Sequence, residues 1–179
     1  MTATPGVASS DLIVRARAGH PEALEAIYVE HGDALMRLAY HVTGSAADAE
    51  DVLHDVFLGL PEALTRYEER GAFGPWLRRV TTRVALDRLR ATRRRREVPL
   101  DGANEPATPG SGGDLAHRSE LERALRKLPD ALRVVFVLKE IEGQTHAEIA
   151  GTLGIRIGTS EVRLHRAIKG LRRYLKEGA

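Results

Sequence analysis

The stretch that decides the fold is "QTHAEIAGTLGIRIGTSEVRLHRAIKGLRR", residues 144–173. Near its start, Thr145 and Glu148 have the spacing of a capping box, which opens a short helix. A glycine then supplies a tight turn, and Thr159 or Ser160 caps a longer helix whose apolar residues recur every three or four positions. Two helices joined by a glycine turn, the second basic on its outer face, predict a helix-turn-helix.

A helix-turn-helix places the first turns of its second helix in the major groove of DNA. There arginine can pair with guanine, glutamate with the amino group of cytosine, and an apolar side chain with the methyl group of thymine. The residues expected to reach base edges are Ser160, Glu161, Val162 and Arg163, and those expected to contact phosphates are Arg156, Thr159, Arg166 and Lys169. An ordinary helical hairpin with a solvated basic face is the alternative interpretation.

The remaining sequence predicts an all-α protein of two small domains. Aromatic residues make up only 4% of the 179 residues, and the helix-favouring Ala, Leu, Arg and Glu are abundant. The segment "VPLDGANEPATPGSGG", residues 98–113, is rich in proline and glycine, which is typical of a flexible linker. We therefore predict a helical domain over residues 10–96, a flexible linker over 97–114 and the helix-turn-helix domain over 115–177.

An acidic face is predicted on one helix of the first domain. In "SAADAEDVLHDVFLGL", residues 45–60, Asp48, Asp51 and Asp55 are three and four positions apart and share one side of the helix. Like charges at this spacing repel by a few tenths of a kcal/mol per pair, roughly, so folding gains nothing from them. An external cationic partner and a solvated acidic surface are both possible explanations.

The helix predicted over residues 73–91 carries a second basic block. Nine arginines and a single acid, Asp87, lie between Arg78 and Arg96. So many arginines favour a phosphate partner, and the alternative is a solvated helix end whose cations suit the helix dipole. Asp87 falls at the edge of the apolar stripe, where we expect it to pair with Arg83 or Arg90, because burying an unpaired charge is costly.

The composition argues against several other classes of protein. The chain has no cysteine, and its seven histidines are scattered without the spacing of a metal site. No phosphate-binding glycine loop, nucleophile elbow or paired-carboxylate site is evident, so we expect neither an enzyme nor a cofactor, and no catalytic or metal-binding residue. The first ten residues contain no apolar run, and we expect a cytoplasmic protein without a membrane segment.

These motifs together resemble an extracytoplasmic-function (ECF) sigma factor of the sigma-70 family, the compact class of bacterial transcription initiation subunits. The matching segments are "DAEDVLHDVFLGL" and "RYEERGAFGPWLRRVTTRVALDRLRATRRRR" in the first domain, and "ALRKLPDALRVVFVLKEIEGQTHAEIAGTLGI" and "GTSEVRLHRAIKGLRRYL" in the second. The resemblance extends over residues 11–175. Their order, with the linker between them, makes the resemblance far more specific than a lone helix-turn-helix.

The resemblance implies a division of labour between the two domains. The first would resemble sigma region 2, binding core RNA polymerase and melting the minus-ten promoter element, with an extruded base held by the loop at residues 65–72. The second would resemble region 4 and bind the minus-thirty-five element as duplex. The implied polymerase-binding residues are Asp48, Asp51, Leu53, Asp55 and Phe57, and the implied minus-ten residues are Arg78, Arg79, Arg83, Arg90 and Arg93.

Several positions depart from the common family pattern. Arg83 stands where Asn is frequent, His54 where Gln is common and Glu161 where Lys is common. A glutamate at that position repels phosphate and should narrow the choice of base. Gly74 and Pro75 precede Trp76, whose place on the apolar stripe favours packing in the core over stacking on a base.

The partners expected from the resemblance are core RNA polymerase, promoter DNA and an anti-sigma factor that covers both domains. The alternative function is a dimeric helix-turn-helix regulator that acts without replacing a sigma subunit. Such a regulator would carry a dimerisation helix and one basic domain per chain, whereas this sequence has two distinct basic blocks and a long linker.

Overall fold

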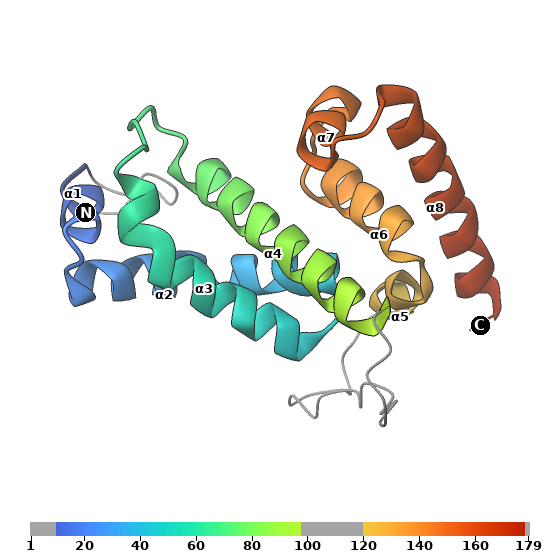
Figure 1. The fold of residues 1–179 in the computed structure, drawn as a ribbon, viewed down its shortest axis with the longest axis horizontal. Coiled ribbons are helices and arrows are strands. Elements are labelled where there is room, and N and C mark those ends of the chain that lie inside the picture. The colour runs from blue at the N-terminus through green and yellow to red at the C-terminus, as the bar shows by residue number, and fades with distance from the viewer. Residues whose placement is uncertain (1–9, 98–119, 178–179) are drawn as a thin grey trace. The chain divides into compact units, whose positions relative to one another are not determined.

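The computed structural model describes residues 10–97 and 120–177, which form helices and, within these two ranges, no strand (Figure 1). They fall into two compact units. The first consists of the residues up to Ala39 and those from Asp48 to the end of α4, and the second of Tyr40–Ala47 and the residues from α5 onward. The predicted all-α class with two helical units is confirmed. The domain limits stay a prediction, and residues 98–114 of the predicted linker lie outside the described residues.

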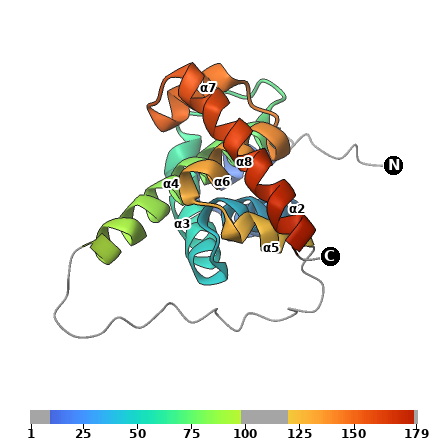
Figure 2. The same ribbon diagram turned by 90° about the vertical axis from the view of Figure 1, so that its right-hand side faces the viewer.

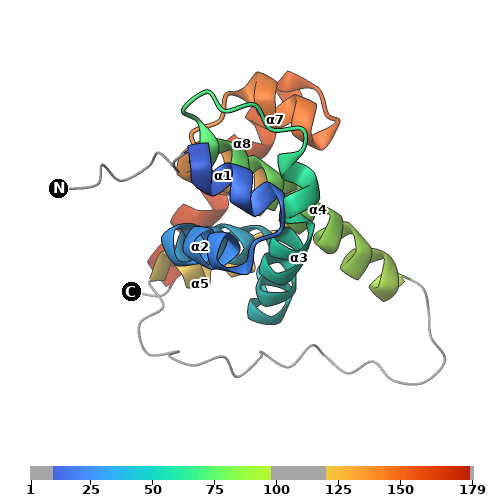
Figure 3. The same cartoon turned by 90° about the vertical axis from the view of Figure 1, so that its left-hand side faces the viewer.

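The first unit contains four helices: α1 (Ser10–Arg17), α2 (Pro21–Thr43, of which the last residues group with the second unit), α3 (Ala46–Leu64) and α4 (Phe73–Glu97) (Figures 1 and 3). α2 begins at Pro21, where proline's fixed φ suits a first helical turn. Gly44 ends it with a φ of 75°, a left-handed conformation that costs little without a Cβ. Both boundaries agree with the sequence pattern.

Two helices of the first unit run further than the sequence predicts. α3 continues through Pro61 to Leu64, although a proline inside a helix removes one backbone hydrogen bond. Leu60 and Leu64 are both fully buried, so packing of this last turn offsets the hydrogen bond that Pro61 cannot donate. α4 extends six residues beyond the predicted end at residue 91, to Glu97.

The core of the first unit lies between α2, α3 and α4. Each helix contributes an apolar stripe at three- and four-residue spacing, and the fully buried members include Ile27, Leu35, Val52, Val56 and Leu77. Ring contacts join all three helices: Tyr28 of α2 meets Phe57 of α3 with ring centroids 5.1 Å apart, and His31 of α2 meets Phe73 of α4 at 5.5 Å. The two faces that α3 and α4 turn away from this core carry the charged residues.

The second unit is built around α8. Its helices are α5 (Glu120–Lys127), α6 (Asp130–Phe136), the π-helical turn η2 (Val137–Ile141), α7 (His146–Leu153) and α8 (Ile157–Glu177) (Figure 2). α8 packs against α5, α6 and α7. At Gly170 an added Cβ would lie 2.8 Å from Cδ2 of the buried Leu128, so glycine allows α8 to approach the end of α5 closely.

Within the ranges that the structure describes, no helix combines the length and the apolar composition needed to cross a membrane. In the same ranges, no three His, Cys, Asp or Glu side chains gather closely enough to hold a metal ion.

Candidate nucleic-acid interfaces

The acidic face of α3 has an internal cationic partner. Arg88 of α4 donates from Nε to Oδ1 of Asp48 at 2.8 Å, and its Nη2 donates to Oδ2 of Asp51. The hydrogen bond to Asp48, together with the charge of Asp51, raises the pKa of Arg88 above its ordinary value. The expectation that folding gains nothing from the acidic face is therefore wrong for Asp48 and Asp51, because α4 lies beside α3 and brings Arg88 to both carboxylates.

The five predicted polymerase-binding residues differ in exposure. Asp51 and Asp55 have exposed carboxylates, with side chains 54% and 59% exposed, whereas Asp48 and Phe57 are half-buried. Leu53 is buried at 4% exposure, so an incoming protein cannot contact much of its side chain. Of this set, Asp51 and Asp55 present the largest charged surface.

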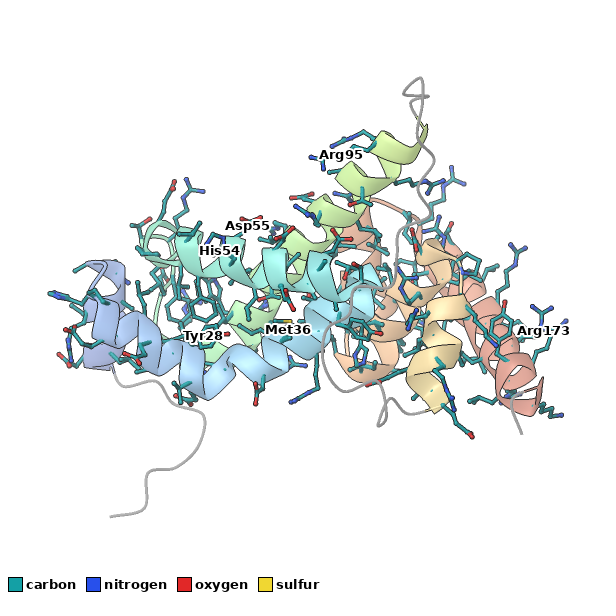
Figure 4. All side chains as sticks on the ribbon, turned by 90° about the horizontal axis from the view of Figure 1, so that it is seen from below. Tyr28, Met36, His54, Asp55, Arg95 and Arg173 are labelled. Carbon is teal, nitrogen blue, oxygen red and sulfur yellow. The ribbon has the colours of Figure 1, made fainter. Side chains whose placement is uncertain are left out.

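An apolar groove lies between α2 and α3 beside these carboxylates. Figure 4 shows Tyr28 and Met36 between the two helices, and His54 and Asp55 on α3. The lining residues are Leu24, Tyr28, Met36, Glu50, Leu53, His54, Phe57 and Leu58. Leu58 is 68% exposed and Tyr28 49%, so large apolar side chains adjoin the acidic face of α3.

α4 carries the predicted minus-ten arginines along its outer side. Arg79, Arg83, Arg90 and Arg93 are exposed, and Arg78 is half-buried. At 100° per residue the four exposed arginines fall within one strip of the helix. Asp87 is also exposed, contrary to the expected place at the edge of the core, and pairs with Arg90 at 3.1 Å between Nη1 and Oδ1. Of its two expected partners, Arg90 is the one that binds it.

The loop between α3 and α4, residues 65–72, is ordered by one carboxylate. Oε1 of Glu69 accepts a hydrogen bond from the hydroxyl of Tyr67 at 3.2 Å and another from the backbone N–H of Gly71 at 2.6 Å. Nη2 of Arg17, on α1, donates to the carbonyl of Tyr67 at 3.1 Å. Burial and, to a smaller extent, the charge of Glu69 raise the pKa of the Tyr67 phenol.

Aromatic rings of α4 pack against the ring of Tyr67 in this loop. Tyr67 lies 4.7 Å from Trp76 and 5.6 Å from Phe73, measured between ring centroids, and Phe73 stacks on Trp76 at 5.8 Å. Trp76 is half-buried within this cluster. The geometry agrees with the expectation that Trp76 packs against the core. α4 begins at Phe73, so Pro75 lies in the first helical turn, where its missing N–H costs little.

The helix-turn-helix of the second unit has the predicted local chemistry. Thr145 caps α7: its side chain accepts from the backbone N–H of Glu148, whose carboxylate accepts from the backbone N–H of Thr145. Gly154 ends α7 in the left-handed conformation with a φ of 64°. The predicted capping box and glycine turn are confirmed, and both helices lie in the same compact unit.

α8 begins at Ile157, ahead of the predicted cap at Thr159 or Ser160, and this changes the environment of the side chains in its first turn. The carbonyl of Arg156 accepts from the backbone N–H groups of Thr159 and Ser160, so these two residues lie inside the first turn. Ser160 is completely buried, and its hydroxyl lies 2.9 Å from Nδ1 of His146 on α7. In this structure Ser160 therefore joins α7 to α8 and does not project toward a base edge, contrary to expectation.

The other predicted residues of this face retain exposure. Arg156, Glu161, Val162, Arg166 and Lys169 are exposed, and Thr159 and Arg163 are half-buried. Within the described part of the chain, the cations Arg156, Arg163, Arg166 and Lys169 form no ion pair. All eight positions lie on α8 or the turn before it, but at 100° per residue they surround the helix and do not share one face.

Sequence reasoning missed three residues of these surfaces: Arg88, His146 and Ile157. The Arg88 contacts connect residues about 40 positions apart, and no local pattern reveals such a pairing. His146 follows the cap of α7, where its helical position alone does not disclose a contact with α8. Ile157 precedes the predicted cap at Thr159 or Ser160, yet it is the first residue of α8 and is 50% exposed.

Comparison with known proteins gives two family matches in the order of the two units. Residues 27–95 match the model of sigma-70 region 2, and residues 118–171 match that of sigma-70 region 4. Among solved structures, that of CnrH in complex with the cytosolic domain of CnrY is similar to this chain, with a TM-score of 0.57 and 25% sequence identity. The alignment covers 94% of this chain and 97% of the CnrH chain. The sigma factor RpoE of Bartonella quintana, solved with the anti-sigma factor NepR, shares the fold at a TM-score of 0.60 and 22% identity, covering 85% and 96% of the two chains.

Curated relatives are sigma factors. RNA polymerase sigma factor CarQ of Myxococcus xanthus is 32% identical over 91% of this chain and 95% of its own length. ECF RNA polymerase sigma factor SigE of Mycolicibacterium smegmatis is 37% identical over 82% of this chain, and the match spans 59% of SigE. The family consists of sigma factors, which are not enzymes. This chain belongs to the sigma-70 family, in its ECF class of RNA polymerase sigma factors.

Proposed function

We propose that the protein is the promoter-recognition subunit of a bacterial RNA polymerase. The observation that carries the proposal is the presence, in one chain, of region 2 and region 4 matches in two separate units, each with cationic side chains on an outer helix face. A sigma factor needs both, because it holds two promoter elements while it binds the enzyme that copies the DNA. The chain then acts in the cytoplasm and has no catalytic activity of its own.

The first unit binds polymerase and the minus-ten element in this proposal. The exposed carboxylates of Asp51 and Asp55 and the half-buried Phe57 form the polymerase side, with Asp48 and Leu53 supporting them from within. The outer arginines of α4 contact the DNA backbone, where each cation releases a counterion. The loop at residues 65–72 accepts an extruded base. The hydrogen bonds that Glu69 accepts from Tyr67 and Gly71 hold the loop in one conformation, which favours such a pocket.

The second unit binds the minus-thirty-five element through α8. The cations Arg156, Arg166 and Lys169 supply phosphate contacts that set the position of the helix, while the exposed side chains of its first turns meet base edges. Arg163 is half-buried and can contribute from the side of the helix.

An anti-sigma factor controls the protein by covering these surfaces. The family resemblance implies such a partner, and the solved structure of CnrH contains a bound protein domain, that of CnrY. The apolar groove between α2 and α3 and the acidic residues beside it are the part of the first unit that such a partner would cover.

Run-off transcription with purified core RNA polymerase tests the proposal. We expect the chain alone to bind promoter duplex weakly, and the chain with core polymerase to start transcripts at a defined subset of sites in a genomic promoter library. If the chain fails to associate with core polymerase at every salt concentration tested, the proposal is wrong. A dimer that binds palindromic DNA without polymerase would support the helix-turn-helix regulator instead.

A further inference from the structure

The last residue of α1 contacts the loop between α3 and α4. Two side chains anchor α1 in the first unit: Ile13 is 2% exposed and Ala16 is fully buried. Arg17 lies four positions after Ile13, about 40° around the helix, so its side chain leaves α1 at the margin of the buried side. Its Nη2 donates to the carbonyl oxygen of Tyr67 at 3.1 Å, across 50 positions of sequence. Figures 1 and 3 show α1 at the end of the unit where the chain passes from α3 to α4.

Tyr67 is the residue at which this loop is fixed. Its side chain is buried, with the ring against two aromatic rings of α4 and the hydroxyl bonded to Glu69. The next four residues, 68–71, are all exposed. Tyr67 is therefore the last buried residue before the chain enters the exposed part of the loop, and Arg17 binds its carbonyl group at that point.

The favourable interaction of a cation with the helix dipole would be a simpler reason for an arginine in the last turn of α1. Arg15 occupies the same turn and has the same advantage, but it lies on the exposed side of the helix and pairs with Glu22 at 3.7 Å. The dipole therefore does not account for the contact of Arg17 with the loop. Because Ile13 and Ala16 already hold α1, one partly exposed hydrogen bond adds little to folding. Its main effect is on the position of the loop.

A loop that is fixed in advance suits the capture of an extruded base. Extrusion already costs the free energy of unstacking and unpairing that base. A loop that must also become ordered when the base arrives binds it more weakly than a loop that is already held in place. We propose that Arg17 is a positioning residue for base capture, which fixes the loop at residues 65–72 through the carbonyl group of Tyr67. The inference rests on the proposed function and gives α1 a part in promoter melting.

Amide hydrogen exchange of the full chain, followed by NMR, tests the positioning without DNA. The backbone N–H of Gly71 donates to Glu69 and therefore reports on the order of the loop. In Arg17→Ala we expect this amide to exchange about fivefold faster, the effect of one hydrogen bond at a partly exposed site. Arg15→Ala removes a cation from the other side of α1 and is the matched control, which should exchange at the wild-type rate. An unchanged rate at Gly71 in Arg17→Ala would overturn the inference.

The functional test uses holoenzyme assembled from the full chain and purified core RNA polymerase. Promoter templates carry one abasic site at each position of the minus-ten element in turn, and run-off transcription at limiting holoenzyme measures initiation. The position at which the missing base lowers wild-type initiation most identifies the captured base. On the intact template Arg17→Ala should initiate about fivefold less than the wild type. On the template that lacks the captured base, the two proteins should initiate equally, because no base remains for the loop to hold.

Arg17→Lys is the conservative replacement. Its ammonium group can donate one hydrogen bond to the carbonyl group of Tyr67, so initiation on the intact template should stay within about twofold of the wild type. Arg15→Ala should match the wild type on every template. If Arg17→Ala loses initiation equally on the intact and the abasic template, Arg17 acts on the DNA backbone and the inference is wrong.

Failure of the inference can be told apart from failure of the proposed function. Absence of any promoter-specific transcript from the wild type would contradict the proposed function, while the exchange rate of Gly71 would still test the positioning by Arg17. A wild type that tolerates an abasic site at every position of the minus-ten element would rule out base capture by the loop, and the inference with it. Promoter-specific transcription in which Arg17→Ala and the wild type depend equally on the captured base would leave the function in place and exclude the role of Arg17.

Discussion

At the scale of single residues, two polar contacts decide which charged and polar groups face outward. Arg88 of α4 forms ion pairs with Asp48 and Asp51. Asp55 is therefore the residue of this acidic face that is least involved in folding. Ser160 of α8 is bound to His146 and is thereby removed from the DNA-facing side. In both cases a residue that looked functional in the sequence proves to hold two helices together.

Replacing Arg88 by alanine should destabilise the first unit. Asp48 and Asp51 would lose their cation and repel each other, and for a partly buried pair we expect a loss of about 1–2 kcal/mol in the free energy of unfolding. Arg88→Lys should lose less of this free energy than Arg88→Ala but should not match the wild type. One ammonium group cannot reproduce the two-pronged contact of a guanidinium. Trp76 is the only tryptophan, so its fluorescence during urea denaturation reports on this unit.

Arg95→Ala is the control for Arg88. Arg95 lies near the end of the same helix and is exposed (Figure 4). Equal denaturation midpoints for Arg88→Ala and Arg95→Ala would show that the contacts of Arg88 contribute nothing to stability.

The pair of His146 and Ser160 should behave as one unit in a double-mutant cycle. Ser160→Ala leaves Nδ1 of His146 without its partner, and His146→Phe leaves the buried hydroxyl unpaired, so each should cost about 1–3 kcal/mol. The double variant should cost less than the sum, because both polar groups are then gone. Amide hydrogen exchange of α7 and α8 measures the effect within the second unit.

Thr152→Ala, at an exposed position of α7, serves as the control. Strictly additive losses for the two single variants would contradict an energetic coupling between His146 and Ser160.

At the scale of elements, caps and turns followed local chemistry, whereas helix lengths followed packing. The cap of α7 and the glycine turns lie where the sequence predicts them. α3 runs through Pro61 because Leu60 and Leu64 are buried, and the first turn of α8 is held against α7 by the buried Ser160 and its contact with His146. The conformation of the loop at residues 65–72 depends on Glu69, whose carboxylate accepts hydrogen bonds from the hydroxyl of Tyr67 and from the backbone N–H of Gly71.

This loop should make the stability of the first unit sensitive to alkaline pH. The pKa of Tyr67 is raised in the folded protein above its ordinary value of 10.0, chiefly by burial. The contribution of the protonated phenol to stability is therefore complete below pH 10 and is lost as the pH rises through the higher folded value. Tyr67→Phe should be less stable at neutral pH, since it lacks the bond to Glu69, but should lose less stability above pH 10.

The comparison requires urea denaturation followed by Trp76 fluorescence at several alkaline pH values. Tyr28→Phe, at a half-exposed position of α2, corrects for general alkaline effects. If wild type and Tyr67→Phe lose stability equally above pH 10, the phenol of Tyr67 is not responsible.

At the scale of the whole molecule, the proposed function needs two units whose roles can be separated by mutation. Asp55→Lys should weaken association with core RNA polymerase, because it reverses an exposed charge of the acidic face. At saturating core concentration the surviving complexes should keep their promoter preference.

Arg163→Ala should do the opposite, lowering initiation at cognate promoters more than it lowers core binding. A labelled-core titration and run-off transcription on one set of samples measure both quantities.

Asp33→Lys, at an exposed position of α2, is the control for charge reversal. Equal losses of core binding for Asp33→Lys and Asp55→Lys would mean that net charge, and not the acidic face of α3, governs the association.

By itself the sequence determined the helical class, the helix-turn-helix, its capping box and the two basic blocks, since each depends on residues within a few positions of one another. The tertiary structure alone decided that Arg88 meets Asp48 and Asp51, that Ser160 is buried, and that Asp87 is exposed. A helical pattern fixes which residues share a face, but the neighbouring helix determines whether that face meets water, a charge or another side chain. Such contacts join residues that are distant in sequence, so they arise only when the helices pack.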